Sequence, residues 1–148
     1  MPKLSFSEFF NPPDGSIIYR SRTSEAFMNS SGVLITRHFQ VATPITPEEM
    51  RVAMEQLKSI AGSNKIYIIS NIDYSLPASK EARDIAAVAL PPLVGAMALV
   101  CSRPLARMGA KIFFGLKPQP YPNKVFDNPF DAEAWILSLQ EKWQKING

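Results

Sequence analysis

The sequence predicts a single α/β domain with a mixed sheet, in which an N-terminal β-hairpin is followed by alternating helices and strands. Two apolar runs have the length and continuity of buried parallel strands, each run precedes a segment with helical spacing, and turn-forming residues separate the segments. We expect about five strands and four helices. Residues 1–15 are predicted to be a lead-in segment, and residues 16–148 the domain.

The hairpin is predicted in the N-terminal part of the chain. Residues 16–28 are compatible with one extended strand, and residues 33–39 form a second strand rich in β-branched and aromatic residues. The turn cluster at 29–32 joins them, which favours an antiparallel pair. Three phenylalanines of the lead-in are expected to dock on the domain: Phe6, Phe9 and Phe10.

The start of the first long helix has the clearest local pattern in the chain. Thr46 is placed as the N-cap, Pro47 takes the first helical position, and Glu49 completes a capping box. Apolar residues then recur on one face as far as Ile60, and Gly62 ends the helix.

Strands and helices alternate after this point. Residues 65–70 and 95–101 are apolar without alternation, which is typical of central strands covered on both faces. Residues 124–126 form a short last strand. Helices are predicted after these strands, beginning at Ser79, near Pro104 and at Asn128.

Most residue types that enzyme and metal sites need are scarce. The chain has one cysteine, Cys101, and one histidine, His38, which excludes an internal disulfide and a multi-cysteine metal site. We expect Cys101 to be a buried structural thiol and His38 to lie at a sheet edge or surface. Neither a G-x-S-x-G elbow nor a glycine-rich phosphate loop is present. The sequence therefore predicts no catalytic residues, no metal, no cofactor and no enzymatic activity.

Charge and hydropathy restrict the partners and the location. The net charge is +3 and no run of five like charges occurs, so we expect no nucleic-acid partner. The arginines at 20, 22 and 37 are interpreted as a solvated surface. The N-terminus lacks the apolar core of a signal peptide, and no segment approaches the roughly 18 apolar residues of a membrane span. We therefore expect a cytoplasmic protein.

The loop after the first central strand is the candidate functional region. In open α/β sheets, ligands bind beyond the carboxyl ends of the strands, and Asp73 follows such a strand. Arg103 and Arg107 are expected near the same edge, so these three residues form a candidate strand-end site. An enzyme at this position would use Asp73 with Tyr74 or Ser75.

Two stretches of the sequence are similar to those of a known fold family. One consists of Arg107 and IFFGLKPQPYPNKVFDNPFDAEAWI at 112–136, where an aromatic pair, a proline-rich turn, a short strand and a tryptophan-bearing helix follow one another. The other is KIYIISNIDYSLPASKEARD at 65–84. Both resemble a group of small uncharacterised bacterial STAS-like proteins, whose fold is that of anti-sigma factor antagonists. The resemblance extends over about residues 16–143.

For antagonists of this fold, the resemblance implies a regulatory protein. A serine or threonine at the start of the second helix is phosphorylated there, which changes binding to a partner kinase. Ser79 occupies that place and Ser75 is a second candidate phosphoacceptor, although residues 73–79 depart from the usual Asp-Ser-Ser-Gly or Asp-Thr-Ser-Gly pattern. Alternatively, the Ser79 hydroxyl serves only as the helix cap.

Three kinds of function remain open. The first is a protein-interaction or regulatory module that binds a protein partner or a second copy of itself. Its candidate interface is an apolar set on the predicted second and third helices, unless these residues lie in the core: Ala86, Leu90, Leu93, Phe113 and Phe114. The second is a binder of a small apolar, lipid-like ligand. Its pocket would use four methionines, which are otherwise core residues: Met50, Met54, Met97 and Met108. An enzyme using Asp73 ranks last.

Overall fold

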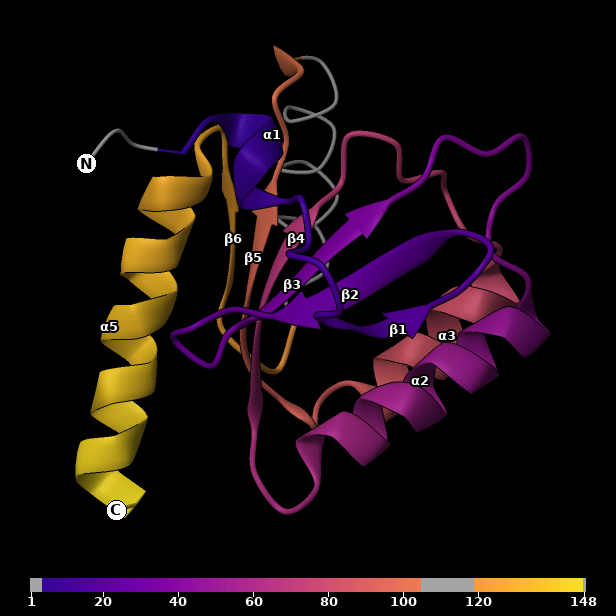
Figure 1. Cartoon of the computed structure of the whole chain (residues 1–148). Helices are drawn as coiled ribbons and strands as arrows, with labels where there is room; N and C mark the ends of the chain where they lie inside the picture. The colour runs from indigo at the N-terminus through magenta and orange to yellow at the C-terminus, as the bar shows by residue number, and fades with distance from the viewer. Residues whose placement is uncertain (1–3, 105–118, 148) are drawn as a thin grey trace.

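The computed structural model describes residues 4–104 and 119–147 of the 148-residue chain. Within these ranges, six strands form one sheet in the order β1-β2-β3-β4-β5-β6 (Figure 1). The strands are β1 (Ile17–Arg20), β2 (Ser24–Met28), β3 (Leu34–His38), β4 (Ile66–Asn71), β5 (Val94–Val100) and β6 (Asn123–Phe126). The described helices are α1 (Phe6–Phe9), α2 (Pro47–Ala61), α3 (Lys80–Ala89) and α5 (Pro129–Asn147).

The sheet is mixed, as predicted. Strands β1, β2 and β3 pair antiparallel, and β3, β4, β5 and β6 pair parallel. The parallel part requires crossover connections, and α2 and α3 provide two of them. The predicted α/β class, with an N-terminal hairpin followed by alternating helices and strands, is confirmed.

The number of strands is one higher than predicted because residues 16–28 form two strands. A tight turn at Ser21 separates β1 from β2. The Ser21 hydroxyl accepts hydrogen bonds from the backbone N–H groups of Thr23 and Ser24, each at 3.2 Å. The Ser21 N–H in turn donates to the Ser24 carbonyl at 2.8 Å. Side-chain hydrogen bonds of this kind favour turns over a continuous strand.

Each face of the sheet is covered by helices, and successive residues of a strand point to opposite faces. On β4, Tyr67 and Ile69 belong to the core cluster under α5, whereas Ile66 and Ile68 belong to the cluster under α2 and α3. Figure 1 shows α2 and α3 side by side on one face and α5 on the other. Both faces of β4 are therefore buried, which explains its continuous apolar sequence.

The lead-in segment packs against the domain. Helix α1 places Phe9 and Phe10 in the core cluster on the α5 side of the sheet, and Phe6 packs against the same cluster. The Phe9 ring meets Phe130 at the start of α5 edge-to-face, with 5.5 Å between the ring centroids. The docking predicted for the three phenylalanines is confirmed.

Gly95 is needed where β5 passes Tyr67. A Cβ atom at position 95 would lie 2.6 Å from the Cζ atom of the buried Tyr67 ring, closer than real Cβ contacts come. Glycine has no Cβ, so the Tyr67 ring can lie against the backbone of β5.

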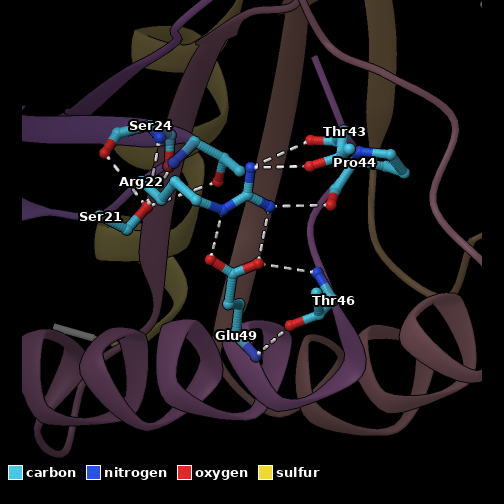
Figure 2. A network of polar contacts seen from close by, with 8 residues as sticks. Ser21, Arg22, Ser24, Thr43, Pro44, Thr46 and Glu49 are labelled. Carbon is cyan, nitrogen blue, oxygen red and sulfur yellow. Dashed lines mark hydrogen bonds and ion pairs between the residues drawn. The ribbon is translucent and has the colours of Figure 1, made fainter. Parts of the chain in front are cut away.

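The predicted start of α2 is present in full and is extended by Arg22. The Glu49 N–H donates to Thr46 Oγ1 at 3.1 Å, and the Thr46 N–H donates to Glu49 Oε1 at 3.0 Å, which completes the capping box. The Arg22 guanidinium also donates two hydrogen bonds of 2.8 Å to the Glu49 carboxylate (Figure 2). Its other N–H groups donate to Thr43 and to the Pro44 carbonyl. Arg22 therefore links the β1–β2 turn to the first turn of α2.

The ion pair between Arg22 and Glu49 is expected to break in acid, when Glu49 is protonated. The hydrogen bonds from Arg22 are the main reason that the pKa of Glu49 falls from 4.5 to about 2. A carboxylate with a lowered pKa contributes stability that is fully present above pH 4.5 and is lost as the pH falls towards 2. The Arg22→Met variant should therefore be less stable than the native protein at pH 6, and the difference should shrink below pH ~4 in urea unfolding.

The Arg51→Met variant is the matched control for this prediction. Among the residues that the structure describes, the partners of Arg51 are Glu48 and Glu81, and both are exposed. Its effect should be small at every pH. A stability difference for Arg22→Met that stays constant between pH 6 and pH ~2.5 would contradict the assignment of Glu49 as the titrating group.

Candidate functional site

The loops that follow β4 and β5 are joined by Asp73. These strands are parallel, so their carboxyl ends lie at the same edge of the sheet. Asp73 Oδ1 accepts a hydrogen bond from the Ser102 N–H at 2.8 Å, and Oδ2 accepts one from the Ser102 hydroxyl at 2.8 Å. Both carboxylate oxygens are thus bonded to one residue, and Asp73 fixes the β4–α3 loop to the end of β5.

Arg103 and Asn71 also bond to the β4–α3 loop, each through the backbone of Asp73. The Arg103 guanidinium donates to the Asp73 carbonyl and lies 5.2 Å from the centroid of the Tyr74 ring, in cation–π geometry. Asn71 Oδ1 accepts the Asp73 N–H at 3.0 Å. The structure therefore brings together Asp73 and Arg103 of the candidate strand-end site, whereas Arg107 lies outside the described residues.

The loop presents an apolar surface to solvent between its two fixed ends. The side chains of Tyr74 and Leu76 are exposed, at 47% and 38% of their area. Asp73 anchors one end of the segment, and the N-cap of α3 forms the other. The sequence does not show how much of a loop side chain is exposed, so Tyr74 was predicted only as a residue of an enzyme site and Leu76 was not predicted as a functional residue.

Both candidate phosphoacceptors lie on this exposed segment. Ser79 is the N-cap of α3, and its hydroxyl accepts the Ala82 N–H at 3.2 Å. Arg83 folds back so that its Nη1 donates to the Ala78 carbonyl at 3.3 Å, next to Ser79. Ser75 is also exposed, and its N–H donates to the Ile72 carbonyl at 3.1 Å. The capping role predicted for Ser79 is thus present.

The lone histidine and the lone cysteine both lie beside this edge of the sheet, where His38 contacts the Asn71 carbonyl and the Cys101 thiol donates to the Arg103 carbonyl. His38 was expected at a sheet edge or on the surface; it lies on β3, between β2 and β4, where it is half-buried, and its Nδ1 is 3.0 Å from the Asn71 carbonyl oxygen. Burial lowers the pKa of His38 and raises the pKa of the Cys101 thiol. Cys101 is buried, as predicted. Among the described residues, no three His, Cys, Asp or Glu side chains are grouped as metal ligands would be.

The predicted apolar interface falls partly in the core. Leu90 and Leu93 pack against the cluster under α2 and α3, and Ala86 is half-buried. Phe113 and Phe114 lie outside the described residues. The large apolar side chain that α3 exposes is that of Val88, at 80% of its area. For Leu90 and Leu93, packing against the core therefore fits better than an exposed interface. Val88 was not predicted as an exposed residue, because it lies one residue before Ala89, outside the apolar stripe of the helix.

A shallow groove of about 740 Å³, largely open to solvent, lies between α2 and α3. The part of its lining that α3 contributes begins at Lys80, the residue after Ser79. Of the four methionines considered for a ligand pocket, Met54 lines this groove, and Met97 packs in the core. Met50 is half-buried on α2, and Met108 lies outside the described residues.

Two of the three arginines interpreted as a solvated surface, Arg20 and Arg37, are partly exposed as expected and also form an ion-pair cluster with the buried Glu25. Glu25 on β2 has 1% of its side chain exposed, and both of its oxygens are bonded to arginines. Arg20 Nε and Nη2 donate to Oε2 at 2.9 and 2.7 Å, and Arg37 Nε donates to Oε1 at 2.7 Å. Burial by itself would raise the pKa of Glu25, but the two guanidiniums outweigh it and hold that pKa below its usual range.

No helix in the parts of the chain that the structure describes has the length and hydropathy to cross a membrane.

Comparisons with known proteins agree with the fold. A family model described as "Domain of unknown function (DUF7793)" matches residues 27–140. No curated protein matches the sequence. A solved structure with a SpoIIAA-like fold, an uncharacterised protein of the DUF3478 family from Shewanella loihica PV-4, superposes with a TM-score of 0.59 at 16% identity. The match covers 80% of this chain and 97% of that chain.

A second solved structure, a protein with unknown function from Arthrobacter sp. FB24, is 20% identical over 75% of this chain and 90% of that chain. Its TM-score of 0.26 is too low to support an inference. The likeness to the SpoIIAA-like structure confirms the predicted STAS-like fold, and at 16% identity it shows the fold alone.

Proposed function

The chain belongs to the DUF7793 family and has a SpoIIAA-like fold, and we propose that it is a non-enzymatic module that binds a protein partner. The loop at 72–79 supports this proposal most, because it exposes Tyr74 and Leu76 on a segment anchored by Asp73 and Arg103. Aromatic and aliphatic side chains on a positioned loop suit a protein contact. Holding the loop in advance also reduces the ordering cost of binding.

Phosphorylation of Ser79 is the proposed control of this contact. A phosphate there would sit at the positive end of α3, which favours negative charge. The Arg83 guanidinium is already bonded to the Ala78 carbonyl beside it, whereas Lys80 is engaged by Asp84 and Glu81 would oppose the added charge. The new charge would lie at the edge of the exposed loop and weaken an apolar contact there. Ser75 is the alternative acceptor.

The partner contact is tested by titrating the isolated partner against loop variants. The partner is first captured from lysate of the native host on immobilised protein, identified by mass spectrometry, purified, and titrated by calorimetry. Replacing Tyr74 and Leu76 together with serine should weaken binding at least tenfold, because exposed aromatic side chains on a loop act as interface anchors. Ile18→Ser on β1, which removes a similarly exposed side chain, is the control. Equal effects of the two changes would contradict the loop contact.

Mass spectrometry tests the proposed phosphorylation of Ser79. The chain is purified from its native host under phosphatase inhibition, and its intact mass and modified site are determined. A phosphate on Ser79, together with weaker partner binding by Ser79→Asp than by Ser79→Ala, is the expected result. An unmodified chain, or equal binding by the two variants, would leave Ser79 as a helix cap.

A small apolar ligand is the second candidate, favoured by the apolar part of the lining of the α2–α3 groove, which includes Met54. A lipid-like compound retained in native mass spectrometry and lost on substitution of groove residues would support it. Catalysis by Asp73 ranks last, because the Ser102 N–H and hydroxyl occupy both of its oxygens.

A further inference from the structure

The groove between α2 and α3 is a second surface that the loop contact leaves unused. Four apolar residues line it: Met54, Ile85, Val88 and Ala89. Three of them are half-buried, whereas Val88 is 80% exposed. Exposed apolar area of this kind in a hollow between two helices suits the apolar face of a third helix.

The charged lining of the groove has an excess of acid. It contains Glu55, Glu81 and Asp84 against Arg51 and Lys80. Both cations are already paired inside the chain: Arg51 bonds Glu81 at 3.3 Å across the groove, and Lys80 bonds Asp84 at 2.8 Å. The Glu55 side chain is exposed and forms no hydrogen bond or ion pair with another residue that the structure describes. The groove therefore presents one carboxylate free to meet a cation.

We propose that this groove binds one amphipathic helix of a partner protein, with its apolar stripe on Val88 and Ile85 and a lysine or arginine opposite Glu55. Side chains three and four residues apart on such a helix form the stripe that a two-helix groove accepts. The proposal deepens the proposed function, since both assume that the chain binds proteins. It uses a different surface, so variants of the loop and variants of the groove test the two separately.

Charge favours a basic helix over a second copy of the chain. In a twofold dimer built on this groove the same patch would contact itself, so two grooves with the same excess of acid would face each other. A like-charge contact of this kind opposes association, whereas a basic helix neutralises Glu55.

The test uses two synthetic helical peptides and the full chain labelled with ¹⁵N. Each peptide has about 14 residues, roughly 20 Å of helix, with leucines at helical spacing. One has lysines on both flanks of the leucine stripe and the other has glutamates. The lysine peptide should shift the amide signals of the groove, including those of Ile85 and Val88. The glutamate peptide should bind at least tenfold more weakly.

Three variants make the test specific. Val88→Lys should weaken binding of the lysine peptide at least tenfold, and a lysine in the last turn of α3 suits the helix dipole, so the fold should persist. Val52→Lys changes a side chain of α2 that is 48% exposed and lies outside the groove lining, and it should leave binding unchanged. Glu55→Lys should reverse the preference, so that the glutamate peptide binds more tightly.

The proposal is overturned if both peptides bind equally, if the shifted signals lie away from the groove, or if Val52→Lys acts like Val88→Lys. Self-association in sedimentation that Val88→Lys abolishes would identify a second copy as the occupant and would also overturn it. The Tyr74→Ser, Leu76→Ser variant should bind the lysine peptide normally. Failure of the groove proposal is thereby distinguished from failure of the loop contact.

Discussion

Replacing Glu25 with glutamine is expected to lower the free energy of unfolding by about 3 kcal/mol, the lower end of the range for breaking a buried ion pair. The Glu25 side chain is 1% exposed, while Arg20 and Arg37 keep part of their guanidiniums in water. This partial exposure is why we expect the lower end of the range. The neutral amide would face two cations with one acceptor oxygen, and its NH₂ group would point at a donor. Urea unfolding at pH 7 measures the effect.

The stability lost in Glu25→Gln should depend on pH in a defined direction. The native pKa of Glu25 is lowered, so its stabilising contribution is fully present at neutral pH and is lost as the pH falls through that lowered pKa. The difference between the native protein and Glu25→Gln should therefore shrink in acid. Glu55→Gln, which changes an exposed carboxylate of α2, should alter stability by less than ~0.5 kcal/mol. A similarly small effect of Glu25→Gln would show that the ion-pair cluster is not needed for stability.

Replacing Phe10 with alanine is expected to cost about 3–4 kcal/mol, the usual loss when a buried phenylalanine leaves a cavity. Phe10 is fully buried, and its ring lies 5.4 and 5.1 Å from the ring centroids of Phe6 and Phe9. The result bears on the predicted boundary between residues 1–15 and 16–148. A large loss would mean that the lead-in segment is part of the cooperative domain. Thermal and urea unfolding provide the measurement.

Leu4→Ala is the matched control, because Leu4 belongs to the same segment and is exposed. Its effect should stay within ~0.5 kcal/mol. If Phe10→Ala changed the free energy of unfolding equally little, the phenylalanines of α1 would add nothing measurable to the stability of the sheet.

The loop proposal and the groove proposal involve adjacent surfaces around the start of α3. Ser79 caps the helix on the loop side, and Lys80 begins the lining of the groove. A phosphate on Ser79 would therefore add negative charge next to a groove that already has an excess of acid. If both proposals hold, phosphorylation should weaken an apolar contact at the loop and strengthen binding of a basic helix in the groove.

Elements whose patterns are local were predictable from the sequence. The capping box from Thr46 to Glu49 depends on residues three positions apart, and the structure shows both of its hydrogen bonds. The strand at 65–70 was recognised because burial on both faces requires a continuous apolar run. Ser79 was placed at the start of a helix for the same kind of reason, since a cap bonds within the first turn.

Contacts between distant segments were decided only by the tertiary structure. Asp73 and Ser102 are 29 residues apart, and Arg22 and Glu49 are 27 apart, so no local pattern pairs them. The same limit explains Glu25, which was passed over in a strand with poor alternation and became the centre of a buried cluster once β1, β2 and β3 were paired.

The sequence by itself determined the class of the fold, the order of most elements and the starts of α2, α3 and α5. These depend on hydrogen bonds and side-chain periods within a few residues. The tertiary structure decided which apolar side chains are exposed: Leu90 is half-buried against the core, whereas Val88, two residues earlier, is 80% exposed. The physical reason is that helical spacing identifies an apolar face, but the elements packed against a helix determine how much of each side chain they cover.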